Sequence, residues 1–115
     1  MCLLMGGRMK TKSAKAKGRR LQNYVAEKFN EYEGYKCRPA IMGEAGADIK
    51  WYEQRPPGIS IECKNQEQWS IHKWWEQTKK NAKEETPVLI VKKNGEEPLI
   101  IMRFDDWIEE WIKRY

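Results

Sequence analysis

Nitrogen and sulfur ligands for a metal are scarce in this 115-residue sequence, which contains one histidine and three cysteines. Cys2, Cys37 and Cys63 lack metal-ligand spacing, which argues against a zinc site, and their odd number indicates a reduced, intracellular protein. No apolar run approaches the ~18 residues of a membrane span, and the opening MCLLMGG is too short for a signal peptide. We therefore expect a cytoplasmic protein (in the host-cell cytoplasm if it is viral) that is not secreted and has no membrane partner.

Acidic residues are absent from the first 20 positions, which hold seven of the 22 basic residues. So polar a segment cannot bury itself, and basic side chains that neutralise phosphates release counterions. We predict a basic, flexible N-terminal arm over residues 1–13 and a single domain over residues 14–115, with a solubilising tail as the alternative role of the arm. The residues expected to bind nucleic acid are Arg8, Lys10, Lys12, Lys15, Lys17, Arg19 and Arg20.

Hydrophobic periodicity predicts helices and strands in the order α-β-β-β-α-β-β-α. Helices are expected over about 14–32 and 69–84 and from 104 onward, and strands over about 35–41, 47–52, 59–64, 88–93 and 98–104. Because a helix separates the third and fourth strands, at least one crossover connection is expected. The predicted fold class is α/β, with a central mixed five-stranded sheet flanked by helices.

A group of two carboxylates and a lysine lies on the second and third predicted strands. Side chains alternate along a strand, so Ser60, Glu62 and Lys64 share one face, and Asp48 begins the neighbouring strand after a glycine-rich loop. Two carboxylates with the Cys63 backbone carbonyl and waters suit Mg²⁺, which keeps several waters when bound. A metal-bound water and a nearby lysine are what phosphodiester hydrolysis requires, with Ser60 as a possible accessory residue.

A simpler interpretation of the same residues is a set of exposed ion pairs across strands. The acid-x-Lys pattern occurs twice here, as DIK at 48–50 and ECK at 62–64, and such a triplet is common in charged sequences. Spacing alone leaves both interpretations open.

The ordered set of motifs resembles the PD-(D/E)xK nuclease superfamily, and within it the archaeal-type Holliday junction resolvases and their phage-borne relatives. The matching positions are Lys17-Gly18, Asp48-Ile49, Glu62-Cys63-Lys64 and Glu76-Gln77. The resemblance implies a restriction-endonuclease-like nuclease domain that acts as a homodimer, with Gln77 in or near its site. It also implies Mg²⁺ as cofactor, with Mn²⁺ able to substitute.

One position departs from the family pattern. Where the family's first helix carries a glutamate four residues after the glycine, this chain has Gln22, which supplies hydrogen bonds but no charge. We keep Gln22 as a site residue and consider Glu44, in the loop MGEAG, as a possible source of the missing carboxylate.

The resemblance predicts endonucleolytic cleavage of branched double-stranded DNA, with four-way junctions resolved by paired symmetric nicks, and no small-molecule substrate. Two alternatives stay open. One is another endonuclease of this superfamily that acts in repair or on flaps, mismatches or duplex sites; the other is a non-catalytic DNA-binding module. The apolar stripe of the last helix is a candidate for the dimer interface.

Overall fold

The computed structural model describes residues 2–52 and 58–113, with side chains from residue 14 onward except that of residue 111. The predicted order of helices and strands is confirmed. The elements are α1 (Cys2–Asn30), β1 (Cys37–Pro39), β2 (Ile49–Trp51), β3 (Ile59–Asn65), α2 (Ile71–Ala82), β4 (Thr86–Lys92), β5 (Leu99–Ile101), α3 (Phe104–Trp107) and the π-helical turn η1 (Ile108–Ile112). No helix in the described ranges has the length and apolar character that crossing a membrane requires.

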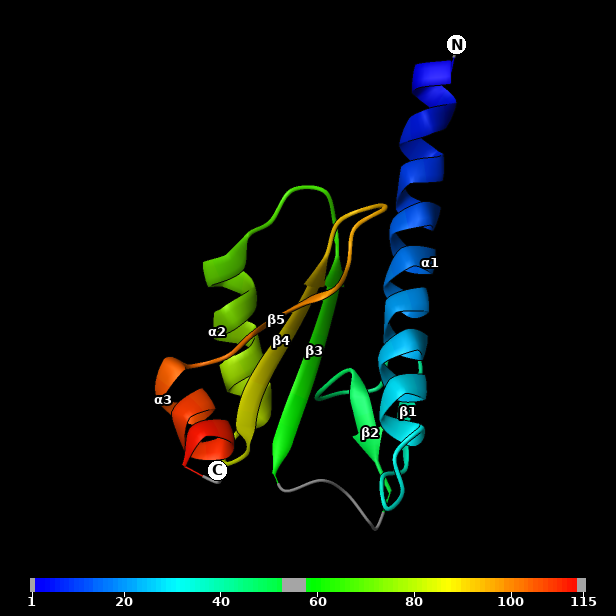
Figure 1. Ribbon diagram of the computed structural model, residues 1–115. Helices are drawn as coiled ribbons and strands as arrows, with labels where there is room; N and C mark the ends of the chain where they lie inside the picture. The colour runs from blue at the N-terminus through cyan, green and yellow to red at the C-terminus, as the bar shows by residue number, and fades with distance from the viewer. Residues whose placement is uncertain (1, 53–57, 114–115) are drawn as a thin grey trace.

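The centre of the fold is a mixed sheet in the order β3-β4-β5. β3 and β4 are parallel, with Glu62 opposite Leu89, and α2 is the crossover that joins them. β5 then returns antiparallel to β4 after a turn at Asn94 and Gly95, where Gly95 adopts a φ of +73°. In Figure 1, α1 and α2 cover opposite faces of this sheet.

The two faces of the sheet bury separate hydrophobic clusters. Leu21 and Val25 of α1 pack with Ile61 and Cys63 on one face, whereas Trp74 of α2 packs with Leu89 and Val91 on the other. The predicted alternation of β3 is therefore confirmed, because Ile61 and Cys63 lie on the α1 face. It follows that Glu62 and Lys64 point toward the α2 side.

The prediction of one five-stranded sheet is wrong, because β1 and β2 form a separate antiparallel pair. The backbone N–H and C=O groups along the edge of β3 that faces β2 form hydrogen bonds mostly with side chains. The Trp51 indole donates to the Ile59 carbonyl at 3.1 Å, and Asp48 Oδ2 accepts from the Cys63 N–H at 2.8 Å. One backbone bond, from the Asp48 N–H to the Ile61 carbonyl, links the strands there. Side chains thus take the place of the ladder that would have continued the sheet.

The first helix is longer than predicted and continues through the basic segment to Cys2. The segment is rich in lysine, arginine, alanine and methionine, which favour helices, and contains no proline. Its N-terminal half extends past the sheet in Figure 1. The boundary at residue 13 and the flexibility of the arm stay predictions.

Candidate active site

Asp48 is presented by the loop of residues 41–47, which turns tightly before β2. Gly46 adopts a φ of +91° in this loop, and a Cβ there would meet Lys50 Nζ at 2.9 Å. Lys50 Nζ in turn donates to the Ala45 carbonyl. The positive φ is what favours glycine at this position, because the flexible end of the lysine could shift away from a Cβ.

Asp48 and Glu62, predicted to converge, lie side by side at the edge of β3. The Asp48 N–H donates to Glu62 Oε2 at 3.0 Å as well as to the Ile61 carbonyl at 2.9 Å. Glu62 is buried, with 6% of its surface exposed, and Asp48 is half-buried. Since the N–H and C=O of a strand residue point the same way, the Cys63 carbonyl faces the same edge as its N–H.

Both carboxyl groups have raised pKa values. Burial, followed by the charge of Asp48, raises the pKa of Glu62 to about 7, although hydrogen bonds and the charge of Lys64 oppose the rise. Burial also raises the pKa of Asp48. Two desolvated carboxylates this close lack sufficient compensating charge, and a bound cation would supply it.

The donor set fits a hard divalent cation. Asp48, Glu62 and the Cys63 carbonyl offer oxygen atoms at one edge, as Mg²⁺ prefers. Among residues 2–52 and 58–113, no cluster of three or more Asp, Glu, His or Cys side chains could hold a metal. A cation held here would therefore complete its coordination with water.

Lys64 lies two residues beyond Glu62 on β3, on the same face of the strand. Its Nζ is 5.9 Å from the centre of the buried Trp74 ring of α2, a cation–π contact that restrains the side chain. Its charge lowers the pKa of both Asp48 and Glu62, so the ammonium group acts on the two carboxyls. The predicted trio is thus brought together.

Gln77 approaches the site through an asparagine that the sequence analysis missed. Gln77 Nε2 donates to Asn81 Oδ1 at 3.2 Å, and Asn81 Nδ2 donates to Glu62 Oε1 at 2.9 Å. Asn81 thereby orients Glu62, and Gln77 orients Asn81 from an exposed position. The four-residue spacing of the two amides on one helix was the available signal.

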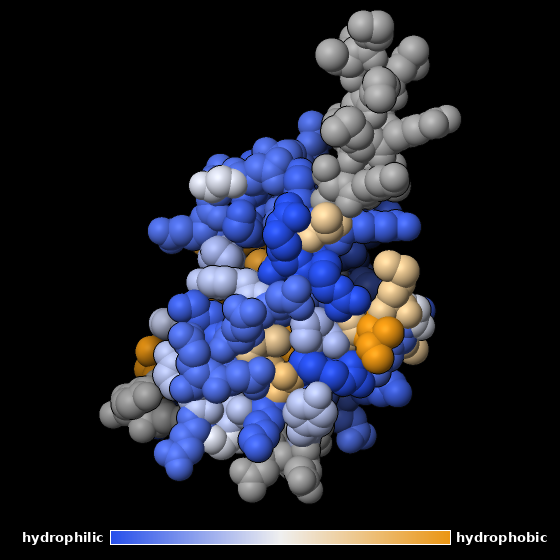
Figure 2. Space-filling model, turned by 90° about the vertical axis from the view of Figure 1, so that its right-hand side faces the viewer, coloured by the Kyte–Doolittle hydropathy of each residue, from blue (hydrophilic) through white to orange (hydrophobic). Residues whose placement is uncertain are grey.

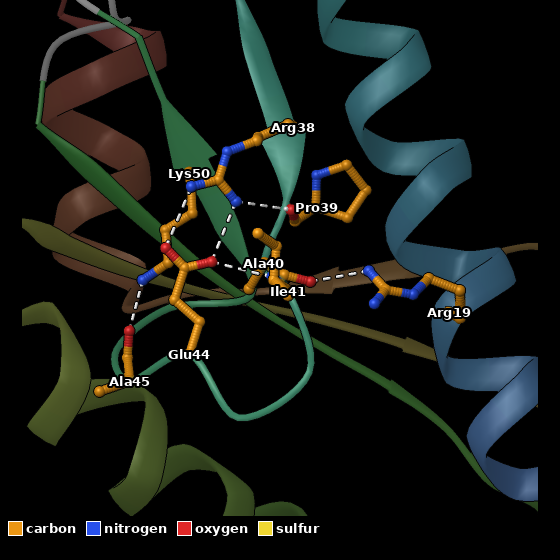
Figure 3. Close-up of polar contacts among 8 residues, drawn as sticks. All are labelled: Arg19, Arg38, Pro39, Ala40, Ile41, Glu44, Ala45 and Lys50. Atoms are coloured by element: carbon orange, nitrogen blue, oxygen red, sulfur yellow. Dashed lines mark hydrogen bonds and ion pairs between the residues drawn. The ribbon is translucent and has the colours of Figure 1, made fainter.

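Glu44 makes its hydrogen bonds with residues other than the site carboxylates Asp48 and Glu62. Its carboxylate accepts two hydrogen bonds from Arg38, at 2.9 and 3.1 Å, and one from the Ile41 N–H at 2.8 Å (Figure 3). The bonds from Arg38 and then from Ile41 lower the pKa of Glu44 to about 2. The residue therefore ties the loop to β1, and this geometry gives no support to Glu44 as a substitute carboxylate.

Gln22 and Ser60 do not join the hydrogen bonds of the site. Gln22 is half-buried on α1, and no hydrogen bond links its amide to the described residues. Ser60 is buried on the face of Glu62, and its Oγ has no hydrogen-bond partner among the described residues. Their roles stay predictions.

The structure describes the side chains of only some of the basic residues of α1. The side chains of Arg8, Lys10 and Lys12 lie outside the described residues. Arg19 Nη1 donates to the Ala40 carbonyl at 2.7 Å (Figure 3). The Ala40 N–H in turn donates to the Asp48 carbonyl. Arg19 thus anchors the residue after β1 that pairs with the backbone of Asp48.

A cleft of about 690 Å³ opens beside the carboxylates. Gly46 and Ala47 line one wall and the C-terminal end of α2 lines the other, with Asn81 between the cleft and Glu62. Its walls carry charges of both signs, positive at Lys50 and Lys83 and negative at Glu84 and Glu85.

Comparison with known proteins gives one match. The model of the family described as "Phage putative PDDEXK endonuclease" matches residues 13–115. No curated protein and no solved structure matches the chain. The matched region contains the carboxylates, Lys64, Asn81 and all the strands.

Proposed function

The chain belongs to the family of phage PDDEXK endonucleases, and on that premise we propose that it hydrolyses DNA phosphodiester bonds with Mg²⁺. Asp48, Glu62 and the Cys63 carbonyl would hold the ion, and Mn²⁺ would substitute for it. The observation that carries the proposal is the reciprocal pairing of a buried and a half-buried carboxyl, in which Glu62 Oε2 accepts from the Asp48 N–H at 3.0 Å and Asp48 Oδ2 accepts from the Cys63 N–H at 2.8 Å. Such an arrangement is costly without a cation and favourable with one.

Each residue of the site has a distinct task in this chemistry. A bound ion would polarise the phosphate and would lower the pKa of a coordinated water toward neutral pH. Lys64 lies on the same face as Glu62, where its ammonium can orient the water or stabilise charge that develops on the phosphate. Asn81 and Gln77 hold Glu62 in the orientation that faces Asp48.

The substrate we propose is branched DNA, with four-way junctions cut by a homodimer. The sequence resemblance to junction resolvases is its main support, and two symmetric nicks require two sites related by a two-fold axis. Exposed apolar side chains on β5 and α3 are compatible with a dimer interface. They are Leu99, Ile100, Phe104 and Trp107, exposed by 52%, 62%, 71% and 42%.

A labelled four-way junction and its matching duplex, each incubated with Mg²⁺ or with EDTA, test this proposal. We expect paired nicks in the junction that EDTA and Glu62→Gln abolish, with a rate loss of about a thousandfold or more. Glu31→Gln is the matched control, because Glu31 is an exposed glutamate that follows α1 and is paired with Lys28 at 3.6 Å. It should cut as the wild type does.

Other outcomes separate the alternatives. Metal-dependent cutting of both substrates would retain the nuclease and reject junction selectivity. Tight binding without cutting would favour a non-catalytic DNA-binding module. The observation that supports this alternative is Gln22, which stands where the family has a glutamate. In that case Asp48→Asn would change neither affinity nor activity.

A further inference from the structure

A second cavity lies on the opposite side of β3 from the carboxylates. It measures about 410 Å³ and runs between α1 and the turn that joins β4 to β5. In Figure 1 this turn reaches across to α1. We refer to this cavity as the hairpin groove, and its polar lining consists of Lys17, Arg20, Tyr24, Asn65, Lys92 and Asn94.

The hairpin groove is positively charged. Three of its lining residues, Lys17, Arg20 and Lys92, are cationic, and none of the described residues that line it is acidic. They come from α1 and from the end of β4, so the fold gathers charges that are about 75 positions apart in the sequence. The side of the molecule formed by α1 is mostly hydrophilic, with hydrophobic side chains in small separate groups (Figure 2).

Asn65 supplies an independent sign of a missing partner. This residue ends β3 with only 8% of its surface exposed, and its Oδ1 has no hydrogen-bond partner among the described residues. Its Nδ2 makes one long bond, 3.5 Å, to the Lys17 carbonyl. An unsatisfied buried acceptor is destabilising, so a donor brought to this position would stabilise the protein.

We infer that the hairpin groove binds one phosphate of the DNA backbone, at a position separate from the cleaved bond. A phosphate would draw Arg20 and Lys92 toward the centre of the groove. A guanidinium or ammonium group there has several N–H donors, so it can bond the phosphate and Asn65 Oδ1 together. The exposed ring of Tyr24 provides an apolar wall for the adjoining sugar.

The two sites share β3. Lys64 points to the face of the carboxylates and Asn65 to the face of the groove. Glu62 and Asn65 are three residues apart, or about 10 Å along a strand. A DNA strand that crosses the end of β3 could therefore contact both sites within a few nucleotides, and the groove would fix the register of cleavage.

This inference rests on the proposed function, because it assumes a DNA substrate. The test measures binding of a labelled junction and duplex in Ca²⁺, to limit cleavage, across a range of salt concentrations. Arg20→Gln/Lys92→Gln should bind about tenfold more weakly at low salt. Its slope of log affinity against log salt should fall by about one, as expected for one lost phosphate contact.

Lys36→Gln/Lys113→Gln is the matched control, because it removes the same charge from exposed positions that do not line the groove. A scan of single methylphosphonate linkages provides the second readout. One neutral linkage near the cleaved bond should weaken binding by wild type and by the control, but should not weaken the Arg20→Gln/Lys92→Gln variant further. Asn65→Asp should also lose affinity, since it places a negative charge in the groove.

The results distinguish the two proposals. If wild-type protein neither binds nor cuts either DNA, the proposed function fails, and the groove assignment fails with it. If wild type binds and cuts but the groove and control variants have equal affinities and slopes, only the groove assignment is overturned. The groove assignment is also overturned if no single neutral linkage weakens DNA binding by wild type more than binding by Arg20→Gln/Lys92→Gln.

Discussion

Glu44 and Asp48 are four positions apart in one loop, yet their surroundings are opposite. Glu44 is paired with Arg38, and its pKa falls to about 2. Asp48 and Glu62 are desolvated beside each other, and their pKa values rise. The protein thus neutralises one carboxylate with its own arginine and leaves the other pair short of positive charge. The difference separates a carboxylate that holds a loop from carboxylates suited to an external cation.

The largest effect that follows from this comparison is a dependence of stability on pH in metal-free protein. Glu62 has a pKa of about 7 when folded and an ordinary value of 4.5, so the folded state binds more protons between these values. Its contribution is fully present below about pH 4.5 and is lost as pH rises through 7. We expect a loss of about 2–3 kcal/mol in the free energy of unfolding. Urea unfolding at pH 4–8 in EDTA measures it.

Glu62→Gln is the control for this titration, because the amide stays neutral. The difference in the free energy of unfolding between wild type and Glu62→Gln should therefore shrink at low pH and grow toward pH 8. Mg²⁺ should restore stability to wild type at pH 8 and have little effect on the variant. Parallel pH profiles for the two proteins would mean that Glu62 has an ordinary pKa, and the comparison with Glu44 would fail.

A smaller effect, on cleavage rate, is expected from the amide that orients Glu62. Asn81→Ala removes a hydrogen bond that lowers the pKa of Glu62, so that pKa should rise further. Since metal binding needs the ionised carboxylate, the acidic limb of the pH–rate profile should move to higher pH. At neutral pH we expect Asn81→Ala to cleave about tenfold more slowly than wild type and Gln77→Ala about twofold more slowly. Lys80→Gln, which changes an exposed residue of the same helix, is the control and should cleave at the wild-type rate. A rate loss without a shift of the profile would mean that Asn81 only supports the fold.

The convergence of Asp48, Glu62 and Lys64 was predictable because it depends on local rules. Strand alternation places Glu62 and Lys64 on one face, and the order of elements places Asp48 on the neighbouring strand. Helical spacing links Asn81 to Gln77, but the contact of Asn81 with Glu62 depends on how α2 lies across the sheet. The division into two sheets was also hidden, because it results from two side chains, Trp51 and Asp48, that satisfy the edge of β3.

The smallest effect is expected at Glu44. Glu44→Gln removes an exposed pair with Arg38, so the melting temperature at pH 7 should fall by a few degrees at most. Because the pKa of Glu44 is lowered when folded, its contribution is present above about pH 4.5 and is lost as pH falls through about 2. Thermal melts at pH 7 and pH 2 should therefore differ from wild type only at pH 7. Glu31→Gln, which breaks the exposed pair of Glu31 with Lys28, serves as the control.

Cleavage by Glu44→Gln decides whether the loop carboxylate and the site carboxylates are truly different. A rate within twofold of wild type is expected, because Arg38 already provides the charge that Glu44 needs. A loss of tenfold or more, together with weaker Mg²⁺ activation, would instead mean that Glu44 leaves Arg38 when metal binds. Glu44 would then supply the carboxylate that Gln22 lacks, and the site would hold its cation with three acidic residues in place of two.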